Sequence, residues 1–146
     1  DTSGAVELSE SVRAAVDASE LVILDIKMPD EERYEKFIGG AIERPLKLLD
    51  HCLKTKKRLW LRTVIVPGIN DEEKVVDEYV ALLGERLKGV EKYELLAFHT
   101  LGFSKYEKMG IVNPLADTPA LGAERLGELQ KYLDEKIERI TGRKNG

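Results

Sequence analysis

The chain has 146 residues, of which 42% are hydrophobic and 34% are charged, and its formal net charge is −4. A chain of this length usually folds as one domain, so we expect residues 1–146 to form a single unit. The negative charge argues against nucleic acid and against an anionic membrane surface as partners. Apolar runs fall short of the roughly 20 residues that a membrane span requires. The lone cysteine, Cys52, excludes an internal disulfide and is typical of a protein in the reducing cytoplasm.

Four segments have the apolar spacing of amphipathic helices: residues 8–19, 42–55, 71–88 and 120–140. In the third segment, Asn70 is the expected N-cap, and Glu73 follows it at capping-box spacing. In the fourth, Thr118 is expected to cap the helix and Pro119 to begin it. Residues 101–119 lack periodicity, and we expect a long loop there that covers the site or contacts a protein partner.

Three apolar segments between these helices are expected to be strands: "LVILDIK" (21–27), "RLWLRTVIV" (58–66) and "YELLAF" (93–98). Their apolar runs are continuous rather than alternating, which is typical of parallel strands covered on both faces. We also expect Trp60 in the core. The stub "DTSG" (1–4) is interpreted as the end of a further strand. The expected fold class is therefore α/β, with parallel strands and flanking helices that provide the crossover connections.

The first strand is apolar where it begins and charged where it ends, at Asp25 and Lys27. Side chains alternate across a strand, so these two point to one face, about 6.5–7 Å apart along the strand. Arg62 lies within the second strand, and His99 follows the third. The carboxyl ends of parallel strands meet at one rim, where ligands bind in α/β folds. We therefore expect Lys27, Arg62 and His99 to line one polar ligand site.

Each of these residues also has a purely structural interpretation. Asp25 and Lys27 would then form an ion pair at the strand end, and His99 would be a hydrogen-bonded loop histidine. Arg62 needs an acidic partner or an anionic ligand, because arginine is rarely buried without one. Cys52 is expected to be a small core residue. Phosphate loops, GxGxxG, HExxH and paired CxxC motifs are absent, so no reaction is identified by a short motif.

Four motifs in this order resemble a known family: "DTSG" (1–4), "LVILDIK" (21–27), "WLRTVIVPGIND" (60–71) and "VEKYELLAFHTLG" (90–102). Together they are similar to the C-terminal half of the pyruvate formate-lyase activating enzymes, which are glycyl-radical-activating members of the radical S-adenosylmethionine (SAM) family. The resemblance covers roughly residues 1–135. It implies that the chain is part of a partial (βα)₆ barrel whose site lies at the carboxyl ends of the strands.

The resemblance also implies a chemistry, in which a [4Fe–4S] cluster cleaves SAM to a radical that removes a hydrogen from a glycine of a partner enzyme. It places five residues in the SAM pocket: Asp1, Asp25, Lys27, Arg62 and His99. Four residues match positions that hold a monovalent cation near SAM: Asp1, Thr2, Ile23 through its carbonyl, and Asp25. The implied partners are a glycyl-radical enzyme such as pyruvate formate-lyase and a reductant such as flavodoxin.

Two features of the family have no counterpart in this chain. The cluster-binding CxxxCxxC motif and the GGE-type motif that meets the SAM amino group are absent, and Cys52 does not match the former. We therefore expect the chain to be the C-terminal portion of a longer activating enzyme and to be inactive by itself. An unpaired parallel-strand edge invites pairing with another chain, so we also expect a homodimer through open sheet edges.

Two other functions are compatible with the same residues. A small α/β domain would bind a phosphorylated or carboxylated metabolite at the same rim, with Lys27, Arg62 and His99 as the anion site. Alternatively, the chain is a non-enzymatic module that binds another protein. Binding of SAM separates the first interpretation from these two.

Overall fold

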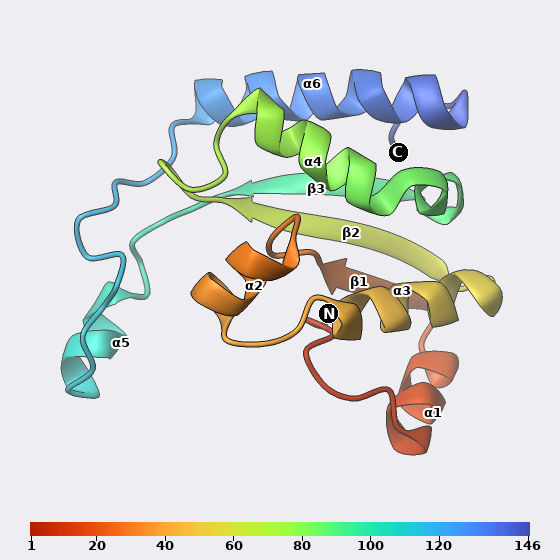
Figure 1. The fold of residues 1–146 in the computed structure, drawn as a ribbon, viewed down its shortest axis with the longest axis horizontal. Coiled ribbons are helices and arrows are strands. Elements are labelled where there is room, and N and C mark those ends of the chain that lie inside the picture. Colours follow the sequence, from red (N-terminus) through yellow and green to blue (C-terminus); the bar gives the residue numbers. More distant parts are fainter.

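Three parallel strands form the centre of the computed structural model, which describes residues 1–146 (Figure 1). They are β1 (Leu21–Asp25), β2 (Arg58–Ile65) and β3 (Lys92–Ala97), in the order β1-β2-β3 across the sheet. Both pairs are parallel, with Asp25 opposite Arg62 and Arg62 opposite Glu94. The predicted parallel arrangement is confirmed.

Six α-helices and one 3-10 helix accompany the sheet: α1 (Glu10–Ala18), α2 (Glu31–Ile38), α3 (Glu43–Lys54), α4 (Glu73–Leu83), η1 (Gly84–Gly89), α5 (Phe103–Lys108) and α6 (Ala123–Thr141). Helix α3 packs on β1 and β2, and α6 packs on β3 and α4. Figure 1 shows α5 extending away from the sheet. None of the helices combines the length and the apolar character needed to cross a membrane.

The core lies between one face of the sheet and the helices. Every second strand residue is buried: Val22 and Leu24, then Leu59, Leu61, Thr63 and Ile65, then Tyr93 and Leu95. The apolar ones pack with residues of α3, α4 and α6 in one continuous cluster, which includes Cys52 as predicted. Burial of this apolar surface is the main driving force for the fold.

The opposite face, called here the open face, carries the alternate side chains: Leu21, Ile23 and Asp25, then Trp60, Arg62 and Val64, then Lys92, Glu94 and Leu96. All of them are half-buried or exposed, and Val64 is 37% exposed. The predictions that both faces are covered and that Trp60 lies in the core are therefore wrong. The apolar runs are continuous because residues such as Ile23 and Val64 occupy the open face.

Residues 1–4 continue the sheet beside β1. The Thr2 amide donates to the Ile23 carbonyl at 2.9 Å, and the Asp25 amide donates to the Thr2 carbonyl at 3.0 Å. These bonds form an isolated parallel bridge between Thr2 and Leu24. The segment therefore lies where the end of a further strand was predicted, although only Thr2 pairs with β1.

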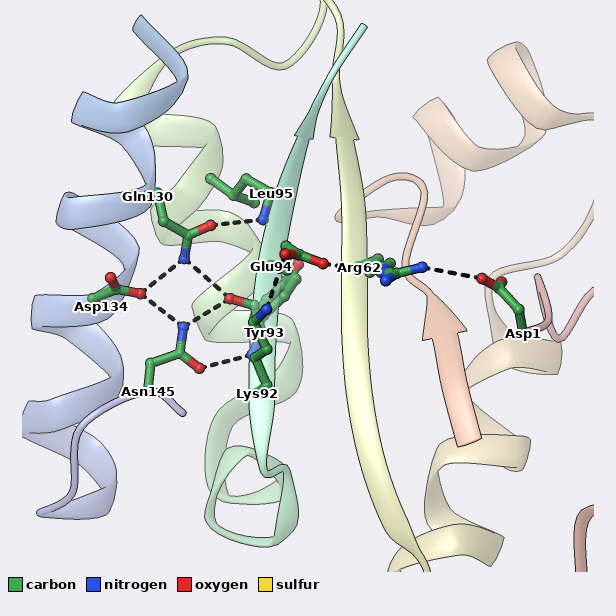
Figure 2. A network of polar contacts seen from close by, with 9 residues as sticks. All are labelled: Asp1, Arg62, Lys92, Tyr93, Glu94, Leu95, Gln130, Asp134 and Asn145. Carbon is green, nitrogen blue, oxygen red and sulfur yellow. Dashed lines mark hydrogen bonds and ion pairs between the residues drawn. The ribbon is translucent and has the colours of Figure 1, made fainter. Parts of the chain in front are cut away.

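The outer edge of β3 is closed by side chains of α6 and the C-terminal segment (Figure 2). Gln130 Oε1 accepts the Leu95 amide at 2.7 Å, and Asn145 Oδ1 accepts the Tyr93 amide at 2.7 Å. Both side-chain amides also donate to the Tyr93 carbonyl, at 3.0 and 2.7 Å, and to Asp134. They occupy the Tyr93 amide and carbonyl and the Leu95 amide, with which a further strand would otherwise pair.

Helix α4 begins later than predicted, because Asn70 has another role. Asn70 is fully buried, and its Oδ1 accepts the Val66 amide at 2.6 Å. Glu72 occupies the N-cap position without a side-chain cap, so the predicted Asn70 cap is wrong. The helix ends at Leu83, where Gly84 adopts a positive φ of 49° and leads into η1.

Two short helices were not predicted. In α2, the Asp30 side chain caps the helix by accepting the Arg33 amide at 2.8 Å, which is a favourable N-terminal pattern. Helix α5 interrupts the predicted loop 101–119. Both helices are short and contain few apolar residues. Neither has an apolar periodicity over several turns from which a helix could be predicted.

Helix α6 also begins later than predicted. Its N-cap is Gly122, so the expected cap at Thr118 and start at Pro119 are wrong. The Leu121 amide instead donates to the Phe98 carbonyl at 3.0 Å. This bond holds the chain extended along the end of β3 before the helix can begin.

Candidate functional site

Charged side chains cross the open face at the level of Arg62 (Figure 2). Arg62 Nε lies 3.1 Å from Glu94 Oε2, and its Nη1 lies 3.1 Å from Asp1 Oδ2. Lys92 Nζ contacts the other oxygen of Glu94, Oε1, at 2.9 Å. Positive and negative groups therefore alternate from Asp1 through Arg62 and Glu94 to Lys92, and we call these four residues the charged row.

Asp25 and Lys27 form an ion pair where β1 ends. Lys27 Nζ lies 2.9 Å from Asp25 Oδ2, and the two side chains are 32% and 25% exposed. Asp25 is the register neighbour of Arg62, so the pair lies beside the charged row. The prediction that Asp25 and Lys27 share one face is confirmed, and the ion pair expected from the structural interpretation is present.

His99 follows β3 and is exposed. It borders an apolar hollow that Val64, Leu96, Ala97 and Phe98 also line. Val64 and Leu96 belong to the open face, so His99 stands at the carboxyl end of that face.

The three predicted binding residues therefore reach one side of the molecule but do not share an enclosed cavity. The hollow beside His99 includes neither Lys27 nor Arg62. Lys27 and Arg62 each contact a carboxylate. The three side chains thus lie on an open, shallow surface of this chain, which would cover one side of a ligand.

A buried hydrogen-bond network holds the strand ends from the covered side of the sheet. The Tyr79 hydroxyl donates to the Lys27 carbonyl at 2.9 Å, and Asn70 Nδ2 donates to the Tyr79 hydroxyl at 3.0 Å. Thr63 Oγ1 donates to the Ile26 carbonyl at 2.6 Å. Burial raises the pKa of Tyr79 to about 12, so its hydroxyl remains a donor at neutral pH. The backbone that carries Lys27 is thus fixed by the core.

Glu94 and Lys92 were not identified from the sequence as site residues. Glu94 is ionised because its hydrogen bond with Lys92, and then its contact with Arg62, lowers its pKa against the opposing effect of desolvation. The signal was present in "KYELLA", where Lys92 and Glu94 alternate with the buried Tyr93 and Leu95. The prediction of a continuous apolar run over residues 93–98 missed this alternation.

The residues present do not fit an iron–sulfur cluster. Cys52 is fully buried, and desolvation raises its pKa to about 11. Iron–sulfur clusters, in contrast, are bound by several cysteine thiolates. His, Cys, Asp and Glu side chains do not come together in groups of three or more that could hold a metal ion. Of the predicted cation ligands, the Ile23 carbonyl accepts the Thr2 amide and Asp1 contacts Arg62.

No family model matches the chain. The pyruvate formate-lyase-activating enzyme of Clostridium pasteurianum is 37% identical over 124 residues, which make up 82% of this chain and 50% of that protein. A domain of the pyruvate-formate lyase-activating enzyme from Bacteroides vulgatus ATCC 8482 superposes with a TM-score of 0.64 at 18% identity, over 94% of this chain and 73% of that one. SuiB of Streptococcus suis bound to S-adenosylmethionine superposes with a TM-score of 0.63 at 16% identity, over 93% of this chain and 29% of that one.

The parallel strands, the flanking helices and these superpositions define the class: the chain has the α/β fold of the radical SAM partial barrels. By sequence, it is a homologue of the pyruvate formate-lyase-activating enzymes. The chain spans about half the length of the curated relatives it matches. The predicted resemblance and fold class are confirmed.

Proposed function

We propose that this chain is the C-terminal portion of an enzyme that uses SAM to generate a glycyl radical on another protein. One observation carries the proposal. In a homologue of pyruvate formate-lyase-activating enzymes, Asp25, Lys27 and Arg62 lie together on the open face of a parallel sheet, near the carboxyl end of β1. Ligands of α/β folds bind outside the carboxyl ends of the strands.

The chemistry of SAM suits these side chains. SAM carries a carboxylate, an ammonium group, a ribose diol and a sulfonium. Lys27, Arg62 and His99 provide donors for the carboxylate, and Asp1 and Asp25 provide acceptors for the ammonium group or the diol. When bound, SAM supplies the adenosyl group for radical chemistry, and the residues of this chain bind and orient it.

The remaining parts of the activity belong to the rest of the proposed parent enzyme. Because Cys52 is buried and alone, the ligands of a [4Fe–4S] cluster would come from the other half, and the isolated chain would be inactive. The monovalent cation would lie between Asp1, Thr2, the Ile23 carbonyl and Asp25, after Asp1 leaves Arg62.

The proposed partners follow from the same assignment. The substrate would be a glycyl-radical enzyme such as pyruvate formate-lyase, and the electron donor a reductant such as flavodoxin, in the cytoplasm. A homodimer of the isolated chain would form through the open β1 edge.

Calorimetric titration of the chain with SAM tests the proposal. Lys27→Ala and Asp25→Ala remove charged hydrogen-bonding groups, so each should weaken SAM binding roughly tenfold to a hundredfold. Lys136 and Asp77 form a matched ion pair between α6 and α4, with Nζ 2.6 Å from Oδ1. Lys136→Ala and Asp77→Ala should leave the affinity unchanged.

Three results would contradict the proposal. Equal losses in all four variants would show that the ion pairs act only on stability. Binding of phosphate esters but not of SAM would favour a metabolite-binding domain. Binding of neither would favour a protein-binding module.

A further inference from the structure

We propose that Glu94 is a positioning residue that fixes the guanidinium of Arg62 through its Nε and thereby reserves the Nη side for the carboxylate of the ligand. This inference rests on the proposed SAM site. It adds a residue that contacts no ligand and sets the direction from which Arg62 binds one.

Glu94 is itself held at both carboxylate oxygens. Oε2 lies 3.1 Å from Arg62 Nε, and Oε1 lies 2.9 Å from Lys92 Nζ. The ammonium group of Lys92 in turn lies 5.1 Å from the centre of the Trp60 ring, a cation–π contact. With both oxygens engaged, the Glu94 carboxylate has little freedom to rotate away from Arg62.

A guanidinium can bind a carboxylate through Nε and one Nη or through its two Nη groups. Because Glu94 occupies Nε, an incoming carboxylate can use only the Nη side. That side faces Asp1, whose Oδ2 lies 3.1 Å from Nη1. Glu94 therefore selects one of the two ways in which Arg62 can bind.

The carboxylates of Asp1 and Glu94 differ in how easily a ligand could displace them from Arg62. The Asp1 side chain is 61% exposed, whereas that of Glu94 is 30% exposed and lies on β3. The Asp1 carboxylate thus occupies the position that a ligand carboxylate would take, and exchange of one for the other leaves the contact with Glu94 intact.

The charges agree with an anionic group at this position. Arg62 and Lys92 contribute two positive charges and Glu94 one negative charge, so these three residues keep a net charge of +1 when Asp1 leaves. Lys92 therefore allows Glu94 to orient Arg62 without cancelling its attraction for a carboxylate.

The test compares Glu94→Gln with wild type in titrations with SAM and with decarboxylated SAM, which lacks the carboxylate. We expect SAM to bind roughly tenfold more weakly to Glu94→Gln and decarboxylated SAM to bind equally to both proteins. The control is Glu91→Gln. Glu91, the residue before β3, contacts Arg58 Nε at 3.0 Å near the amino end of β2, so this variant should bind both ligands as wild type does.

A second measurement does not depend on the ligand. In ¹⁵N spectra of the free chain, the Arg62 Nε–H should exchange faster with water in Glu94→Gln than in wild type and in Glu91→Gln. Unchanged exchange, or an equal loss of affinity for both ligands, would overturn the inference. If wild type binds neither ligand, the proposed function and the ligand part of the inference both fail, while the exchange rate still decides whether Glu94 holds Arg62.

Discussion

At the scale of single residues, Tyr34 and Tyr79 are equally buried but differ in what their hydroxyl groups contact. Each is 1% exposed. The Tyr79 hydroxyl donates to the Lys27 carbonyl and accepts from Asn70, whereas the Tyr34 hydroxyl has no hydrogen-bond partner. A buried polar group without a partner lowers stability, and removal of one partner from a satisfied pair does the same.

The two tyrosines should therefore respond differently to loss of the hydroxyl. Tyr79→Phe should lower the free energy of unfolding by about 1–3 kcal/mol, because it leaves the Lys27 carbonyl unsatisfied. Tyr34→Phe, the matched control, should leave the free energy unchanged or raise it. Urea unfolding measures both changes, and equal changes in the two variants would show that the hydrogen bonds of the Tyr79 hydroxyl do not contribute to stability.

Glu94 makes the stability depend on pH. Its pKa lies below the ordinary value of 4.5 because Lys92 and then Arg62 stabilise the carboxylate. For a group whose pKa is lowered by folding, the stabilisation is present above the unfolded-state pKa and is lost as the pH falls through the folded-state pKa.

Glu94→Gln should accordingly be less stable than wild type at pH 7, and this gap should narrow as the pH is lowered from about 5 to about 3. Urea unfolding at several pH values measures the gap. A gap that stays constant across this range would mean that the glutamate stabilises the fold without its charge.

At the scale of elements, the edge of β3 is closed by amide side chains rather than by another strand. Gln130 comes from α6 and Asn145 from the segment after it, and together they satisfy the amides of Leu95 and Tyr93 and the Tyr93 carbonyl. Exposed strand edges promote association with other chains, so these side chains protect the sheet.

Loss of both side chains should expose this edge. In the double variant Gln130→Ala and Asn145→Ala, the amide protons of Tyr93 and Leu95 should exchange with water roughly tenfold faster, because each loses a hydrogen bond. Lys131→Ala alters an exposed neighbour on the same helix and should have no effect. Native-state hydrogen exchange provides the measurement, and unchanged protection would show that packing alone shields the edge.

The elements differ in how far the sequence alone predicts them. The strands and α3 were predictable because their apolar patterns are local and several turns or residues long. The role of Asn70 was not, because its three hydrogen-bond partners, which come from β2, the residues after it and α4, lie together only in the folded chain.

In the candidate site too, the local features could be predicted from the sequence and the tertiary contacts could not. That Arg62 requires an acidic partner follows from its position in a strand, and Asp25 and Lys27 share a face by alternation alone. The identity of the partners, Glu94 and Asp1, depends on the register of β2 with β3 and on the path of the first residues. Register is fixed by packing across the whole sheet rather than by any one segment.

At the scale of the whole molecule, the two borders of the sheet differ. Beyond β1, Thr2 alone forms a bridge. An apolar hollow adjoins this border, lined in part by Val6, Val12 and Leu21, and Val6 is 59% exposed. Unpaired backbone next to exposed apolar surface favours association.

The isolated chain should therefore dimerise through its β1 border. Light scattering at high protein concentration should show a dimer, and Val6→Asp should shift the population toward the monomer by placing a charge in the apolar hollow. Val112→Asp serves as the control, since Val112 is 88% exposed on a different segment. A monomer at all concentrations would contradict the prediction.

Gln130 and Asn145 bind backbone groups at the β3 border of the sheet, whereas the β1 border is paired only at Thr2. An additional strand would therefore meet less obstruction next to β1 than next to β3. A strand that joined there would extend the open face beyond Asp1 and Asp25, on the side of the charged row away from Lys92.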